Sequence, residues 1–210
     1  MATVMTHTGE IPASQLGTTL PHEHFFVNIM QERREVLLLD ERLITNEVTK
    51  FAEQGGRTLF ELSNSTISKG AIAEHAGHSD ARFTRPPENV EACIRVADAA
   101  GLQMVLSTGY YRDPYLDAVV LNEYSTNDLA GFIMSDILEG FPGTDVKAGI
   151  IGEVGANKQF VTALEERSFR AAARASVKTN RAVYTHAVFW PVARQQIEIL
   201  QEEGVDLSRV

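Results

Sequence analysis

The chain has 210 residues, of which 44% are hydrophobic and 22% charged, as is ordinary for a globular protein. Its formal net charge of −9 argues against nucleic-acid binding, which needs a basic surface. With a single cysteine, Cys93, the chain cannot form an internal disulfide, and we expect this side chain to pack in the core. No apolar run approaches the ~18 residues of a membrane helix, and residues 1–14 lack the features of a secretory signal, so we expect a cytoplasmic protein without a membrane partner.

Strand-like and helix-like patterns then alternate along the chain. A hairpin of residues 3–6 and 9–12 comes first, and five further strands are predicted at 18–24, 57–63, 102–107, 148–154 and 182–186. Helices are predicted between Asp40 and Gly55, from Pro87 to Gly101, at 126–139, at 162–179 and from Pro191 to Gly204. No repeat or linker divides the chain, so we expect a single domain over residues 1–210.

Strand followed by helix, repeated in this way, predicts an α/β fold with a parallel sheet. A doubly wound sheet and a (β/α)8 TIM barrel both fit the alternation. A dinucleotide-binding sheet would carry a G-x-G-x-x-G turn after its first strand, and the sequence has none there. The predicted strands end instead in polar or special residues, which is where barrel enzymes build their sites. We therefore favour the barrel.

The stretch "GTTLPHEHFF" places two histidines one residue apart at the end of the first of these strands. In a strand, side chains i and i+2 share a face, so His22 and His24 would point together to one side. A shared metal ion is the sharpest reason for such a pair. The competing interpretation is one histidine hydrogen-bonded in a core and the other solvated.

Four motifs, "GTTLPHEHF", "STGYY", "VKAGIIGEVG" and "YTHA", stand in order at the ends of the first, third, fourth and fifth strands. With them, the chain resembles the phosphotriesterase-related family of the amidohydrolase superfamily. The tail "LQEEGVDLSRV" is similar to the segment just before that family's sixth strand. The resemblance implies a TIM barrel that holds two divalent metal ions, usually zinc, between the strand ends.

Residue by residue, the resemblance implies that His22 and His24 hold one ion, that Glu153 bridges both, and that His186 holds the second. Gly152 stands where another subgroup has a lysine, so a carboxylated lysine is not expected. A hydroxide shared by two ions is a strong nucleophile near neutral pH. On this basis Glu153 is assigned a catalytic as well as a metal-binding role.

Two tyrosines, Tyr110 and Tyr111, close the third strand of the barrel pattern. We expect them to contact substrate, with Tyr111 the candidate for a catalytic contact. Aromatic packing under a loop is the competing interpretation.

The implied function is metal-dependent hydrolysis of an ester-like bond in a small molecule: a lactone, a carboxylic ester or a phosphotriester. Because the sequence ends at Val210, where the sixth strand would begin, we expect a barrel truncated after about five β/α units and an incomplete second metal site. The alternative is a catalytically incompetent, truncated remnant that binds a metal or ligand. A third hypothesis is a barrel lyase or isomerase that uses the histidines without metal. Exposed sheet edges would favour a homo-oligomer.

The segment from Ser65 to Arg85 is longer than the ~2–6 residues of an ordinary βα connection. It follows the second strand of the barrel pattern, so it would cover the mouth of the site or form a flexible insertion. Its stretch "EHAGHSD" resembles a metal site, but we interpret it as solvated surface because no strand or helix orients it. Arg85 would line the mouth.

Overall fold

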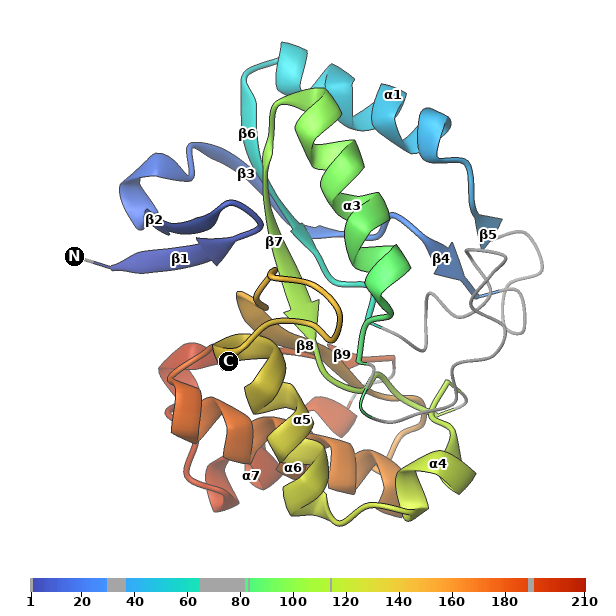
Figure 1. Cartoon of the computed structure of the whole chain (residues 1–210). Helices are drawn as coiled ribbons and strands as arrows, with labels where there is room; N and C mark the ends of the chain where they lie inside the picture. The colour runs from blue at the N-terminus through green and yellow to red at the C-terminus, as the bar shows by residue number, and fades with distance from the viewer. Residues whose placement is uncertain (1, 30–36, 65–81, 83, 114, 189–190) are drawn as a thin grey trace.

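The computed structural model describes residues 2–29, 37–64, 82, 84–113, 115–188 and 191–210. Its centre is a five-stranded parallel sheet whose spatial order, β3-β6-β7-β8-β9, is the order of the chain. The strands are β3 (Thr18–Glu23), β6 (Gly56–Glu61), β7 (Gln103–Thr108), β8 (Ile150–Ala156) and β9 (Val183–Ala187). A doubly wound sheet reverses its order at a switch point, whereas this sheet curls without reversal (Figure 1). The barrel prediction is confirmed for this part of the fold.

Helices cover the outer face of this sheet (Figure 1). They are α1 (Glu41–Glu53), α3 (Pro87–Ala100), α5 (Thr126–Leu138), α6 (Ala163–Thr179) and α7 (Val192–Glu202). Helix α1 packs against α3, α5 against α6 and α6 against α7. Each of these five helices was predicted from apolar periodicity and terminal residues. No helix within the described ranges is long and apolar enough to cross a membrane.

The contacts at the helix ends explain why these ends could be predicted from the sequence. The side chain of Asp40 accepts a hydrogen bond from the backbone N–H of Leu43, and Thr162 with Glu165 forms a complete capping box. Pro87 occupies the first turn of α3, and Gly101 ends that helix in the left-handed region at φ 67°. These local rules require no knowledge of the tertiary fold.

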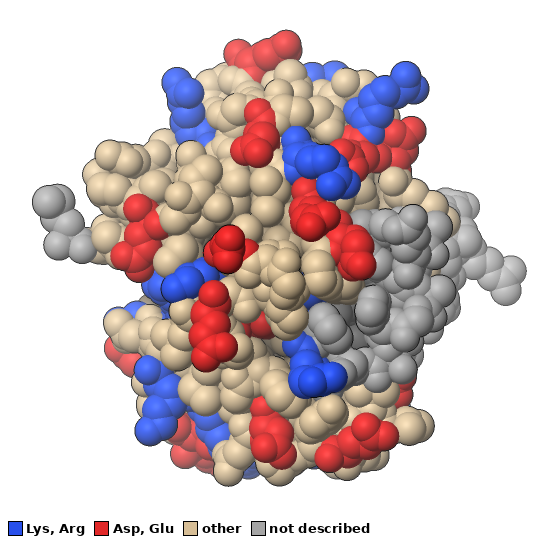
Figure 2. All heavy atoms as spheres, viewed as in Figure 1, with Lys and Arg blue, Asp and Glu red and all other residues tan. Residues whose placement is uncertain are grey.

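The core lies between the sheet and the helices. Cys93 on α3, Met104 on β7, Ile133 on α5 and Phe169 on α6 have no exposed surface. The packing role predicted for Cys93 is therefore confirmed. On the face shown in Figure 2, basic and acidic side chains are interspersed, so the described residues there offer no continuous basic surface for nucleic acid.

Smaller elements complete the fold. The predicted hairpin of β1 (Thr3–Thr6) and β2 (Gly9–Pro12) is confirmed. Sequence analysis missed the two-residue strands β4 (Val27–Asn28) and β5 (Leu37–Leu38), which pair antiparallel, and the short helix α4 (Ala118–Asn122). It also missed two 3-10 helices, Ala13–Gln15 and Leu207–Arg209. Most of the predicted lid segment from Ser65 to Arg85, including "EHAGHSD", lies outside the described residues.

Candidate metal centre

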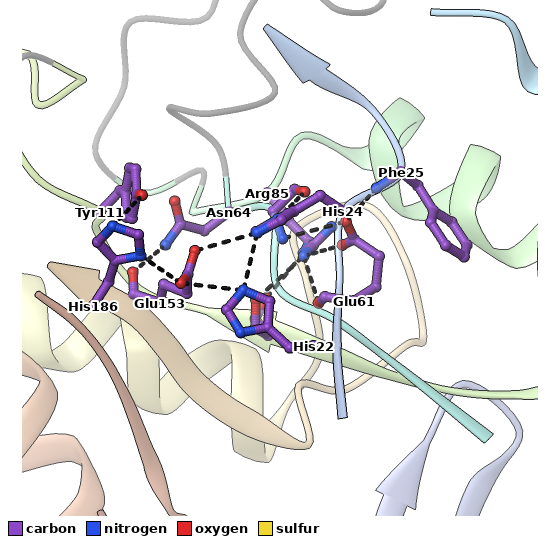
Figure 3. A network of polar contacts seen from close by, with 11 residues as sticks. His22, His24, Phe25, Glu61, Asn64, Arg85, Tyr111, Glu153 and His186 are labelled. Carbon is purple, nitrogen blue, oxygen red and sulfur yellow. Dashed lines mark hydrogen bonds and ion pairs between the residues drawn. The ribbon is translucent and has the colours of Figure 1, made fainter. Parts of the chain in front are cut away.

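Two histidines from the end of β3 meet a carboxylate from β8 (Figure 3). One ligand atom from each of His22, His24 and Glu153 lies within 4.8 Å of the other two. Nε2 of His22 is 3.2 Å from Oε1 of Glu153, and Nε2 of His24 is 3.4 Å from Oε2. The two Nε2 atoms are 3.1 Å apart. The shared strand face predicted for the histidine pair is thus present, and curvature of the sheet brings β8 to it.

His186 reaches the same carboxylate from the neighbouring strand. Gly155 of β8 pairs with His186 of β9, and Nδ1 of His186 lies 2.8 Å from Oε1 of Glu153. Its Nε2 lies 3.3 Å from the hydroxyl of Tyr111. The structure therefore assembles the four residues that the family resemblance nominated as metal ligands. Their binding of a metal remains a prediction.

The electrostatics of the cluster favour an ionised carboxylate. Glu153 is only 1% exposed, and this burial raises its pKa, but hydrogen bonds from His186 and His22 outweigh burial and lower the pKa to about 2. Burial lowers the pKa of His24, which favours the neutral ring that a metal requires. The hydrogen bond to Glu153 raises the pKa of His22.

The donor set fits a divalent cation. Oε2 of Glu153 is buried and accepts no hydrogen bond from the described residues. A buried carboxylate oxygen that accepts no hydrogen bond carries a desolvation penalty that a cation would offset. Imidazole nitrogen with carboxylate oxygen is a ligand combination that suits zinc and similar ions.

Gly152 has a steric reason to be glycine. Its φ is +130°, and a Cβ there would lie 2.4 Å from the carbonyl oxygen of Tyr184. A side chain at this position would therefore be strained. The geometry agrees with the expectation that position 152 carries no carboxylated lysine and that Glu153 supplies the carboxylate.

Tyr110 and Tyr111 lie in different surroundings. The side chain of Tyr111 is buried, with its hydroxyl against His186, and the guanidinium of Arg112 lies 4.9 Å from the centre of its ring. Tyr110 is 2% exposed and packs in the main hydrophobic core. This position agrees with the packing interpretation of Tyr110, and its contact with substrate stays a prediction. Tyr111 stays a prediction.

The residues that support this cluster were not predicted from the sequence. Oγ of Ser63 lies 2.9 Å from Nδ1 of His24, and Nδ2 of Asn64 donates to the backbone oxygen of Glu153 at 2.9 Å. Glu61 and Arg85 form a fully buried ion pair beside them. The expectation that Arg85 lines the mouth is wrong, because its side chain has no exposed surface. A charged residue in the buried strand β6 was the available signal for such a pair.

Comparison with known proteins identifies the family of this chain. Residues 81–210 match the family model described as the phosphotriesterase family. The chain belongs to this family. The phosphotriesterase homology protein of Escherichia coli is 32% identical over 196 residues, which are 92% of this chain and 60% of that protein. The N-acetyltaurine hydrolase of Mus musculus is 27% identical over 98% of this chain and 62% of its own length.

Two solved structures agree with the fold of this chain. The crystal structure of the E. coli protein, complexed with phosphate in its active site, covers 93% of this chain with a TM-score of 0.78. That of the lactonase Lmo2620 from Listeria monocytogenes is 25% identical, covers 99% of this chain and has a TM-score of 0.80. This chain spans 61% and 64% of those two chains, respectively.

Proposed function

We propose that the chain carries the metal centre of a phosphotriesterase-family hydrolase that cleaves an ester-like bond in a small molecule. The observation that carries the proposal is the convergence of His22, His24 and His186 on the buried carboxylate of Glu153. Family membership and the relatives' names, a lactonase among them, support hydrolysis as the reaction class. Lactones, carboxylic esters and phosphotriesters are the proposed substrates.

Each residue has a proposed role. His22, His24 and Glu153 would hold one ion, and Glu153 with His186 would contact a second. Zinc is the ion that these ligand types favour. When bound, such ions polarise a carbonyl or phosphoryl oxygen and generate hydroxide near neutral pH. Glu153 is ionised at neutral pH, because its pKa is about 2, and so supplies negative charge to both positions.

Tyr111 is the proposed substrate contact. Its hydroxyl lies 3.3 Å from Nε2 of His186, at the edge of the cluster. There it could donate a hydrogen bond to a substrate oxygen on which negative charge develops. The ring is held in place by packing on Tyr115 and by the guanidinium of Arg112.

A second candidate is a chain that binds metal without turnover. Among the described residues, Glu153 and His186 are the only ligands available to the second ion. A catalytic zinc site ordinarily has three protein ligands and an open position for water. This candidate predicts metal binding by the chain without hydrolysis.

Hydrolysis assays with and without metal distinguish the two candidates. The purified chain is loaded with Zn²⁺ or Mn²⁺ and given p-nitrophenyl acetate, a γ-lactone, paraoxon and N-acetyltaurine. We expect hydrolysis of at least one ester-like substrate that chelation abolishes and that a His22→Ala, His24→Ala variant lacks. Hydrolysis that persists after chelation and in the His22→Ala, His24→Ala variant would contradict the proposal. Faster hydrolysis of N-acetyltaurine than of the esters would show that the bond cleaved is an amide and not an ester.

A further inference from the structure

We propose that Glu61, held by Arg85, is a positioning residue for His24 and thereby controls the metal affinity of the centre. The inference rests on the proposed metal centre. Figure 3 shows Glu61 in contact with Arg85 and with the backbone of Phe25, the residue that follows His24.

One oxygen of Glu61 accepts hydrogen bonds from the backbone of two residues next to His24, one that follows it in the chain and one that contacts its ring. Oε1 accepts hydrogen bonds from the backbone N–H of Phe25 at 3.1 Å and of Ser63 at 3.2 Å. Phe25 follows His24 in the chain, and Ser63 is the residue whose hydroxyl lies 2.9 Å from Nδ1 of His24. A shift of this oxygen would therefore move both the backbone of His24 and the partner of its ring.

The sheet itself does not fix His24. Strands β3 and β6 pair as far as Glu23 and Glu61, and the backbone N–H of Leu62 then donates to the backbone oxygen of Glu23 at 2.9 Å. His24 is the first residue after β3. The carboxylate of Glu61 replaces ladder hydrogen bonds where the two strands part, so it determines the direction in which the chain leaves the sheet.

Arg85 fixes the carboxylate. Its Nη2 lies 2.5 Å from Oε2 of Glu61, and both side chains have no exposed surface. The same guanidinium donates to the backbone oxygens of Glu61 on β6 and Ser107 on β7, and to Oδ1 of Asn89 on α3. It thus ties Glu61 and its strand β6 to β7 and α3.

A buried ion pair is a poor way to stabilise a core. Well-packed hydrophobic residues of similar volume are often equally or more stabilising, because both charges must be desolvated. The pair Glu61–Arg85 therefore calls for another role, and the contacts of Glu61 with Phe25 and Ser63 supply one. They hold Nδ1 of His24 against Ser63 and leave Nε2 directed at His22 and Glu153. Such support typically changes metal affinity by about 10- to 100-fold.

Cobalt binding tests the inference, because the visible absorption of Co²⁺ reports its coordination. The whole chain is titrated with Co²⁺ as wild type, Glu61→Gln, Ser63→Ala and the double variant. We expect Glu61→Gln to weaken binding about 10- to 100-fold and to alter the spectrum at saturation. Since Glu61 acts partly through Ser63, the double variant should lose less affinity than the sum of the single changes.

Glu165→Gln is the matched control. Glu165 is equally buried, and its Oε1 also accepts two backbone N–H groups, from Asn157 at 2.8 Å and Asp113 at 3.2 Å. We expect this variant to lose stability with an unchanged Co²⁺ spectrum. If Glu61→Gln does not fold, the Co²⁺ affinity and spectrum of Ser63→Ala provide the test, since this variant removes only a hydroxyl. Unchanged Co²⁺ affinity and spectrum in the folded variants would overturn the inference.

A metal-free measurement separates the two proposals. Ring signals of His24, assigned by their loss in His24→Ala, are compared by NMR in the absence of metal. We expect them to shift in Glu61→Gln and to stay in place in Glu165→Gln. If the wild-type chain binds no Co²⁺ and the His24 signals still shift in Glu61→Gln, the metal centre is rejected and the positioning role is kept. If the wild-type chain binds Co²⁺ and the His24 signals do not shift in Glu61→Gln, the positioning role is rejected and the metal centre is kept.

Discussion

At the scale of residues, Glu153 is the group on which the centre depends. It lies against three histidine rings, is buried, and keeps its negative charge at neutral pH because its pKa is about 2. One of its oxygens has no hydrogen-bond partner among the described residues. Such an oxygen is suited to a cation.

Glu153→Gln tests this dependence, because it keeps the shape and removes the charge. We expect the affinity for Zn²⁺ to fall by at least about 100-fold, since two prospective ion positions share this carboxylate. Isothermal titration calorimetry measures the change. Glu23→Gln is the matched control, because Glu23 lies between the two histidines in the chain and is not part of the ligand group. Equal affinity in the Glu153 variant and the wild type would remove Glu153 from the centre.

Asp136 gives a second prediction at this scale. It is 1% exposed, accepts hydrogen bonds from the hydroxyls of Thr84 and Thr108, and burial raises its pKa to about 7. The native state therefore binds a proton that the unfolded state releases near pH 4. The free energy of unfolding should fall as pH rises from about 4 to about 7, by up to about 1.4 kcal/mol per unit, and level off above.

Urea unfolding at several pH values in the presence of a chelator measures this slope. In Asp136→Asn the slope should be smaller over the same window. An equal slope in the variant and the wild type would show that Asp136 does not bind the extra proton.

At the scale of elements, Arg85 links β6, β7 and α3 through one buried guanidinium. Its removal would leave the carboxylate of Glu61 buried without a counter-charge. Surface pairs behave differently, because water and salt screen them. The exposed pair of Arg95 on α3 and Glu41 on α1 shows this second type.

We expect Arg85→Ala to destabilise the fold by about 3–5 kcal/mol, and Arg95→Ala by about 0–1 kcal/mol. Urea unfolding measures both. Arg85→Met combined with Glu61→Leu should recover only part of the stability, because it removes both buried charges but leaves the backbone N–H groups of Phe25 and Ser63 without their acceptor. Similar decreases in the free energy of unfolding for Arg85→Ala and Arg95→Ala would show that the buried pair stabilises the fold no more than the exposed pair does.

The sequence predicted those elements whose signals are local. Capping at Asp40 and Thr162, and the termination at Gly101, allowed helix ends to be placed within a residue or two. Strands β4 and β5 escaped notice because two residues carry no periodicity and their pairing is set by the fold. The histidine pair could be predicted from strand geometry. The Glu61–Arg85 pair could not, because its partners are 24 residues apart and meet only when β6 and α3 pack.

At the scale of the whole molecule, the sheet has two unpaired edges among its five strands. Within the part of the chain that the structure describes, strand β3 pairs only with β6, and β9 pairs only with β8. The chain also spans about 60% of the length of its E. coli relative. Edge strands with free backbone groups favour association with another chain.

We therefore expect the 210-residue chain to associate with itself as its concentration rises. Sedimentation velocity over a hundredfold range of concentration measures the mass. The weight-average mass should increase with concentration, because unpaired edges and the partly exposed leucines Leu37, Leu38 and Leu39 are available for contact. A constant monomer mass over the whole range would contradict this expectation.

The metal content of the purified chain shows whether His22, His24 and Glu153 form a metal site. The chain is loaded with Zn²⁺, separated from free metal and analysed by mass spectrometry of the element, beside a His22→Ala, His24→Ala variant. We expect about one bound ion in the wild type, because three ligands serve the first position, and a strongly reduced content in the variant. A wild type without zinc, or a variant that retains as much as the wild type, would contradict it.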